Sequence, residues 1–154
     1  MIVIRNAEIL SIRASGPGVT RGDIIIEGSK IVSVGPPAPQ DLRPEKEIDA
    51  TGMLAMPGLI NGHFHSSGNL MKGTVPNLPL ELFMLYEVPP LKHGRGLARA
   101  SYVRTMLGAV EMLKQGITAV HDDAFYVPTP TETDIDAVMC AYRDSGIRAT
   151  VAID

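Results

Sequence analysis

The residues best suited to chemistry in this sequence are two histidines separated by one residue, His63 and His65. They follow a short apolar run, Leu59-Ile60, that is typical of a β-strand. Because side chains on a strand alternate between its two faces, His63 and His65 point the same way and can hold one ion between them. The alternative is that the two imidazoles are only solvated or hydrogen-bonded, since His-x-His is a short pattern. The flanking residues must decide between these interpretations.

The residues before the histidines form a longer pattern that supports the metal site. Asp49-Ala50-Thr51-Gly52 is followed by apolar residues and then by Pro-Gly-Leu-Ile-Asn-Gly over residues 57–62. With His63 and His65, this pattern resembles the entrance to the barrel of the amidohydrolase superfamily of metal-dependent hydrolases. Asn61 in place of Asp, and the later stretch 71–73 (Met-Lys-Gly), resemble its cytosine deaminase-like and chlorohydrolase-like branch.

The resemblance implies an α/β fold, namely the start of a (β/α)8 barrel of the TIM type preceded by part of a small β-sandwich. Such a barrel takes about 250 residues, whereas this sequence has 154. We therefore expect about the first third of such a protein. Residues 1–56 are the expected N-terminal part of a composite β-sandwich domain, and residues 57–154 the first βα units of a truncated barrel.

The residues before position 57 carry the pattern of a small β-sheet. Gly28-Ser29 separates two Ile- and Val-rich runs and predicts a hairpin turn, because Gly accepts the positive φ that such a turn needs. The expected strands cover residues 2–4, 7–10, 23–27 and 30–34, with a loop over 35–46. A small sheet buries one face only if something packs against it.

From position 57 the pattern changes to strands alternating with helices, which favours βαβ units and a parallel sheet. The long connection over residues 66–98 contains a short apolar helix near 80–86, and loops of this length are usually lids or binding loops. The other expected elements are strands at 59–63, 117–121 and 147–154, and helices at 103–113 and 131–146, with Gly116 and Gly146 as C-terminal stops.

The active sites of eightfold barrels lie at the C-terminal ends of the strands, where His63 and His65 are expected. Neutral imidazole suits zinc and iron, so Zn²⁺ is the first choice and Fe²⁺ the alternative. The resemblance implies hydrolytic deamination, or related C–N or C–Cl hydrolysis, of a small heterocyclic substrate by a metal-activated water. The family's remaining ligands lie on later strands, so we expect this chain alone to hold metal weakly and not to turn over substrate.

Two further residues are candidates for substrate binding. Lys72 lies in the segment after the first barrel strand and could meet a polar substrate group, or could be an ordinary surface lysine. His121 ends the expected second barrel strand, and the alternative is a hydrogen-bonded loop residue. His93 has the setting of a solvated loop residue, and the single cysteine, Cys140, that of a buried structural thiol.

The composition excludes some classes of partner. The chain is 45% hydrophobic and 20% charged with a net charge of −3 and no block of like charge, so nothing favours nucleic acid or an anionic membrane surface. No apolar run reaches the roughly 18 residues of a membrane span, and residues 1–6 lack the pattern of a secretory signal. One cysteine fits a reducing compartment. We therefore expect a cytoplasmic protein that acts on a small molecule.

Two other functions stay open at this stage. A truncated, non-catalytic chain would expose unpaired parallel strands and apolar helix faces, and would form homo-oligomers or pair with the missing remainder of the barrel. A complete small binding protein with structural histidines is the third possibility, although the last strand would then lack a covering helix.

Overall fold

The computed structural model describes residues 1–13, 16–74, 77–87, 97–126 and 129–153. The chain divides into two compact units, Met1–Pro57 and Gly58–Asp154. Within the described ranges, no helix is long and apolar enough to cross a membrane. His93 and Asp154 lie outside the described residues.

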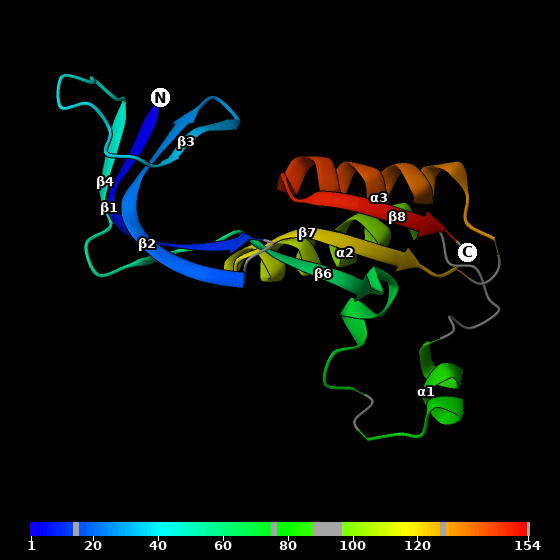
Figure 1. Cartoon of the computed structure of the whole chain (residues 1–154). Coiled ribbons are helices and arrows are strands. Elements are labelled where there is room, and N and C mark those ends of the chain that lie inside the picture. The colour runs from blue at the N-terminus through cyan, green and yellow to red at the C-terminus, as the bar shows by residue number, and fades with distance from the viewer. Residues whose placement is uncertain (14–15, 75–76, 88–96, 127–128, 154) are drawn as a thin grey trace. The chain divides into compact units, whose positions relative to one another are not determined.

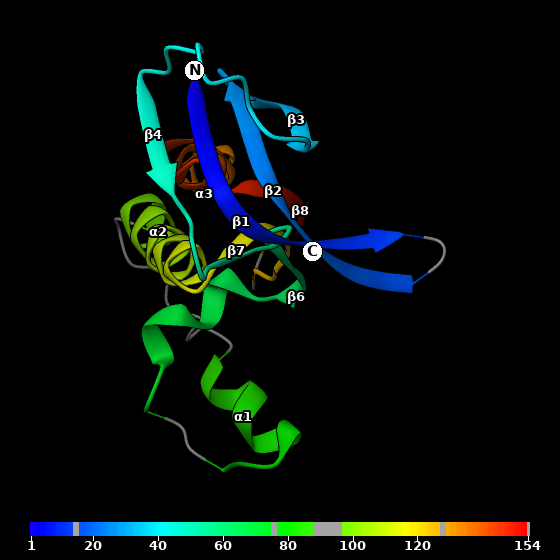
Figure 2. The same cartoon turned by 60° about the vertical axis from the view of Figure 1, so that its left-hand side comes forward.

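The first unit is a sheet of mixed strand direction (Figures 1 and 2). The strand order is β3-β2-β1-β4, with β5 also paired to β1. Neighbouring strands β1–β2 and β2–β3 are antiparallel, whereas β4 and β5 run parallel to β1. The strands are β1 (Ile2–Arg13), β2 (Gly16–Glu27), β3 (Lys30–Gly35), β4 (Lys46–Asp49) and β5 (Leu54–Ala55).

The hairpin predicted at Gly28-Ser29 is confirmed, since Glu27 pairs with Lys30. The two separate strands predicted at 2–4 and 7–10 are wrong, because both runs belong to the single strand β1. The ladder between β1 and β2 is irregular between Ile4 and Ala7. Asn6 lies there with φ 61°, in the left-handed region that Asn tolerates better than most residues. The irregularity interrupts the hydrophobic alternation and makes one strand look like two.

A buried carboxylate holds this irregular point of β1. Asp23 of β2 accepts hydrogen bonds from the backbone N–H of Asn6 (2.9 Å) and of Ala38 (2.8 Å), and lies 3.4 Å from Arg5 Nη1. Burial raises the pKa of Asp23, but the two N–H groups and the Arg5 guanidinium outweigh burial and lower its pKa. The loop after β3 is thereby tied to the first two strands.

The second unit is a parallel sheet with helices packed on one face (Figure 1). The strand order is β6-β7-β8, and both strand pairs are parallel, which confirms the predicted βαβ arrangement. Its strands are β6 (Leu59–Phe64), β7 (Ile117–Ala124) and β8 (Arg148–Ile153). Its helices are the 3-10 helix η1 (Ser66–Met71), α1 (Leu80–Glu87), α2 (Leu97–Lys114) and α3 (Glu132–Ser145).

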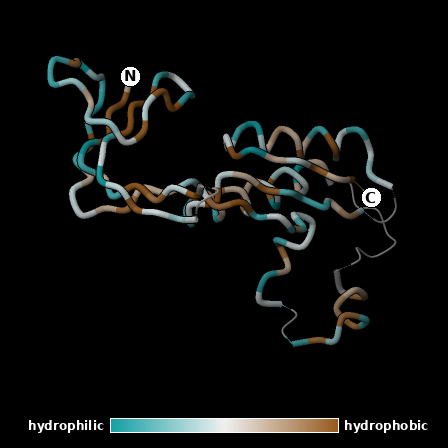
Figure 3. The backbone as a smooth tube through the Cα atoms, viewed as in Figure 1, coloured by the Kyte–Doolittle hydropathy of each residue, from teal (hydrophilic) through white to brown (hydrophobic). Residues whose placement is uncertain are grey.

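The core of this unit lies between the sheet and helices α2 and α3. Val120 of β7 is buried with Ala109 and Met112 of α2 and with Val138 and Tyr142 of α3. Along α3 the tube in Figure 3 alternates between hydrophobic and hydrophilic segments, as expected of a helix with one buried face. The barrel interior of the predicted fold corresponds to the other face of this sheet, where His63 and His65 lie.

Helix α3 begins and ends where the sequence predicts. Thr131 is the N-cap and exchanges hydrogen bonds with Asp134 in a capping box, and Gly146 ends the helix with φ 78°. Helix α2 also forms, but its most regular apolar stripe, which includes Val103 and Leu107, is not its buried face. Val103 and Leu107 remain 43% and 40% exposed.

Candidate metal centre

The two histidines meet at the carboxyl end of β6. The ladder to β7 is irregular between Asn61 and Phe64, so β6 carries one extra residue just before its end. Bulges of this kind re-aim side chains and are common beside active sites. Asn61 Oδ1 accepts a hydrogen bond from the backbone N–H of His63 (3.3 Å). His65 follows the strand with extended backbone, φ −123° and ψ 94°, so both imidazoles point to the same face.

The geometry of the two rings fits a shared metal ion. His63 Nε2 and His65 Nε2 are 3.1 Å apart, and the rings are perpendicular with centroids separated by 4.7 Å. Imidazole binds zinc at about 2.0–2.1 Å, so two nitrogens on one ion at 90–110° from each other lie about 2.8–3.4 Å apart. The observed separation falls in that range.

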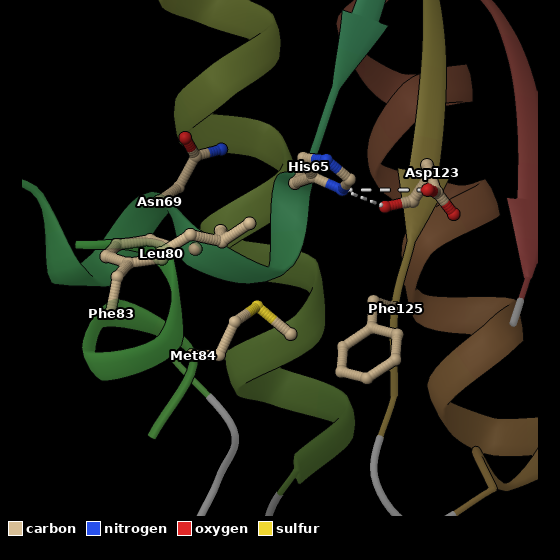
Figure 4. A pocket seen from close by; sticks show the side chains of 8 residues that line it. His65, Asn69, Leu80, Phe83, Met84, Asp123 and Phe125 are labelled. Atoms are coloured by element: carbon tan, nitrogen blue, oxygen red, sulfur yellow. Dashed lines mark hydrogen bonds and ion pairs between the residues drawn. The ribbon is translucent and has the colours of Figure 1, made fainter. Parts of the chain in front are cut away.

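The other ring nitrogen of His65 already has a partner. His65 Nδ1 lies 2.9 Å from the backbone carbonyl oxygen of Asp123, which can only accept a hydrogen bond. Nδ1 therefore carries the proton in the neutral ring, and Nε2 keeps its lone pair for a metal ion. The Asp123 carboxylate is 3.8 Å from the same nitrogen (Figure 4).

A buried carboxylate lies directly beside this contact. Asp122 is fully buried and accepts hydrogen bonds from the Ser66 backbone N–H (2.8 Å) and from the Tyr142 hydroxyl (2.7 Å). Burial and the adjacent Asp122 carboxylate raise the pKa of Tyr142 far above its ordinary value, so its hydroxyl stays a donor.

The sequence pattern did not indicate a role for either aspartate, because the predicted strand ended at His121. The strand continues through Asp122 and Asp123 to Ala124, since these residues pair with Val151, Ala152 and Ile153 of β8. The available signal was alternation, which continues as Val120, Asp122 and Ala124 on the buried face.

Helix α2 packs tightly against the side chains of Phe64 and Asn69 at Gly108. A Cβ atom placed on Gly108 would lie 2.5 Å from Phe64 Cζ, and closer still to Asn69 Nδ2. Phe64 separates the two histidines in the chain. Asn69 donates a hydrogen bond to the Arg104 carbonyl (2.8 Å), which holds η1 against the same helix.

A pocket of about 460 Å³ adjoins His65 (Figure 4). Its polar part is formed by His65, Asn69 and Asp123, with Gly68 beside them, and its apolar part by Leu80, Phe83, Met84 and Phe125. Helix α1 therefore places apolar side chains next to a candidate metal ligand. This confirms the short helix predicted in the long connection and gives it a position at the site.

The remaining candidates lie elsewhere. Lys72 is half exposed and forms an ion pair with Glu111 of α2. His121 is exposed on β7, and neither residue lines the pocket. Cys140 is partly buried, and its sulfur accepts a hydrogen bond from Arg143.

The site offers two metal-binding nitrogens and no third ligand among the residues that the structure describes. Within these ranges, no three His, Cys, Asp or Glu side chains gather closely enough to hold a metal ion. Two ligands leave at least two positions of a tetrahedral ion open.

Comparison with known proteins gives consistent matches along almost the whole chain. A deaminase of Pelotomaculum thermopropionicum, named 5-methylthioadenosine/S-adenosylhomocysteine deaminase, is 36% identical over 98% of this chain and 33% of its own length. The 5'-deoxyadenosine deaminase of Methanothermobacter thermautotrophicus is 32% identical over 98% of this chain and 32% of its own length. The chain thus spans about a third of the length of these relatives.

A solved structure shows the same fold. A mutant of the atrazine chlorohydrolase from Arthrobacter aurescens TC1, complexed with zinc and atraton, superposes with a TM-score of 0.79 at 29% identity, covering 99% of this chain and 35% of the other. The present fold therefore matches the N-terminal portion of a larger hydrolase. The model of the amidohydrolase family matches residues 54–153, which include β6, β7, β8 and both histidines. The chain belongs to the amidohydrolase family.

Proposed function

We propose that this chain provides two metal ligands and one wall of the substrate pocket of a metal-dependent hydrolase that deaminates a small heterocyclic substrate. The observation that carries the proposal is the 3.1 Å separation of His63 Nε2 and His65 Nε2 at the carboxyl end of β6. The family membership and the deaminase relatives support the same activity. Related C–N or C–Cl hydrolysis is the variant of this reaction that the chlorohydrolase neighbour supports.

The ion is proposed to be Zn²⁺, held through the Nε2 atoms of His63 and His65. Imidazole also accepts Fe²⁺, and the zinc in the chlorohydrolase neighbour favours the first choice. When bound, Zn²⁺ would lower the pKa of a coordinated water to about 7 and so supply a nucleophile derived from water at neutral pH. This chain would fix the orientation of the ligands, because the Asp123 carbonyl accepts a hydrogen bond from His65 Nδ1–H and thereby orients the ring.

The pocket supports a flat, partly apolar substrate. Phe83, Met84 and Phe125 offer apolar surface beside His65, while Asn69 and Asp123 offer polar groups. Aromatic rings and a thioether stack well on heteroaromatic rings. Because the two deaminase relatives are named for adenosine-type compounds, we place an adenine nucleoside first among substrates, with loss of ammonia. Neither Lys72 nor His121 lines this pocket. Both remain proposed substrate contacts, which would have to form outside it.

The open sheet edges favour a second candidate function. Within the described residues, β6 and β8 each pair on one side only, and unpaired parallel edges favour association. A non-catalytic chain that pairs with another copy, or with the rest of a barrel, would bury these edges without needing the histidines. Metal binding separates the two candidates.

The test is metal analysis and ammonia release with the purified full-length protein. The variants are His63→Ala and His65→Ala, and His121→Ala is the matched control because it removes an imidazole from the neighbouring strand. We expect about one equivalent of zinc, lost in the first two variants and kept in the control, and no release of ammonia from 5'-deoxyadenosine by the two variants that lack zinc. Metal retained in both ligand variants would contradict the proposal, and a metal-free, self-associating protein would support the second candidate.

A further inference from the structure

We infer that Asp122 and Tyr142 are positioning residues for His65, which they act on through the backbone of Ser66. This inference rests on the proposed function, because it concerns the same candidate metal ligand. It goes beyond that function in naming two buried residues that touch neither the histidine rings nor the pocket. The geometry of the Asp122 carboxylate carries it.

The two carboxylate oxygens of Asp122 hold different elements. Oδ1 accepts the backbone N–H of Ser66 at 2.8 Å, and Oδ2 accepts the Tyr142 hydroxyl at 2.7 Å. Ser66 is the first residue of η1 and directly follows His65, whereas Tyr142 lies on α3. One side chain of β7 thus joins the end of β6 to a helix on the covered face of the sheet.

The next residue of β7, Asp123, holds the same histidine through its backbone carbonyl. The Asp123 carbonyl oxygen accepts a hydrogen bond from the Nδ1–H of His65, with 2.9 Å between the nitrogen and the oxygen. Successive residues of β7 therefore restrain first the backbone after His65 and then its ring. Alternation sends the Asp122 side chain to the covered face, so the backbone after His65 is held from that face, whereas the ring is held by a backbone carbonyl of the same strand.

Burial restricts the movement of the Asp122 carboxylate. Asp122 and Tyr142 are 0% and 3% exposed, and a buried carboxylate must keep its hydrogen-bond donors because no water replaces them. Tyr142 holds Oδ2, so the carboxylate cannot rotate away from Ser66 without losing a partner. Asp122 and Tyr142 therefore fix the position of the Ser66 amide, and with it the start of η1.

The experiment uses Tyr142→Phe in the full-length protein, with Asp122→Asn as a second variant. Tyr102→Phe is the matched control, because the Tyr102 hydroxyl donates to Asp144 at 3.1 Å and joins α2 to α3 on the surface. Each tyrosine variant removes one Tyr–Asp hydrogen bond and keeps the ring. Zn²⁺ affinity is measured by competition with a chelator, and urea unfolding of the metal-free protein measures stability.

A second measurement separates positioning from stability. The ¹⁵N shifts of the His65 ring in the folded, metal-free protein report which nitrogen carries the proton. We expect Tyr142→Phe to weaken Zn²⁺ binding about 10-fold, the lower end of what removing an outer partner of a metal ligand costs, and to mix the two ring tautomers. Tyr102→Phe should change neither. Asp122→Asn should act in the same direction, because the amide keeps only one accepting atom.

The outcomes distinguish this inference from the proposed function. If His65→Ala loses zinc while Tyr142→Phe and Asp122→Asn keep the affinity and tautomer seen in Tyr102→Phe, the positioning role is wrong and the proposed function stands. If His65→Ala keeps zinc, the proposed function fails, whatever the other variants do. Loss of affinity with an unchanged His65 tautomer, in proportion to lost stability, would also overturn the positioning role.

Discussion

Replacing Gly108 by alanine should destabilise the protein even though alanine has the higher helix propensity and Gly108 lies within α2. Gly108 is an interior residue of α2, and alanine is more favourable than glycine inside a helix by about 0.8–1.0 kcal/mol. The added methyl group, however, would lie 2.5 Å from Phe64 Cζ and even closer to Asn69 Nδ2. Carbon atoms in contact are normally about 3.5–4.0 Å apart, so the Phe64 ring must retreat by about 1 Å or α2 must move away from β6.

The balance of these two effects gives the expected magnitude. Overpacking of this kind costs about 1–3 kcal/mol, which exceeds the gain in helix propensity over most of its range. We expect a net loss of about 1 kcal/mol, and a decrease in melting temperature of about 2–4 °C for a protein of this size. Since Phe64 lies between His63 and His65, the same displacement should weaken zinc binding several-fold.

The assay is urea unfolding of the metal-free protein together with zinc titration. Phe64→Leu, which removes the far end of the ring, completes a double-mutant cycle with Gly108→Ala. The two changes should compensate by about 0.5–3 kcal/mol, as expected of residues in contact. A Gly108→Ala variant that is about 1 kcal/mol more stable than the wild type, with no coupling to Phe64, would refute the close packing of Gly108 against the Phe64 ring.

Three other substitutions test separate parts of the structure. Thr131→Ala removes the capping box of α3 and should lower the free energy of unfolding by about 1 kcal/mol, with the loss seen as reduced helix content on heating. Asp23→Asn removes a carboxylate whose pKa is lowered in the folded state; the wild type should be the more stable above about pH 4, and its advantage should shrink as unfolding is measured at lower pH. Phe83→Ala should raise KM for the nucleoside with little change in kcat or zinc content, whereas Leu85→Ala, on the same helix but outside the pocket, should leave KM unchanged.

The features that could be predicted from the sequence are those set by neighbours along the chain. Thr131 and Gly146 mark the ends of α3 because capping depends on a few adjacent backbone groups. The turn at Gly28-Ser29 joins two antiparallel strands for the same reason. The fold class followed from the alternation of strands and helices, and the family from the residues around His63 and His65.

The buried face of α2 could not be predicted in this way. Its most regular apolar stripe, which includes Val103 and Leu107, is partly exposed, whereas Ser101, Thr105 and Gly108 lie on the packed side. Gly108 faces the side chains of Phe64 and Asn69, and Ser101 donates a hydrogen bond to Asp134 of α3. The periodicity of one helix carries no information about how near its neighbours lie.

The sequence by itself determined that both histidine side chains point to the same face, because alternation is a property of any β-strand. Only the tertiary structure decided that their Nε2 atoms are 3.1 Å apart, that Asp123 selects the His65 tautomer, and that Asp122 connects β7 to Ser66 and Tyr142. The contacts of Asp122 and Asp123 join residues 20 to 58 positions apart. They exist only once the parallel strands and helix α3 have packed together, since no local pattern fixes which distant groups will meet.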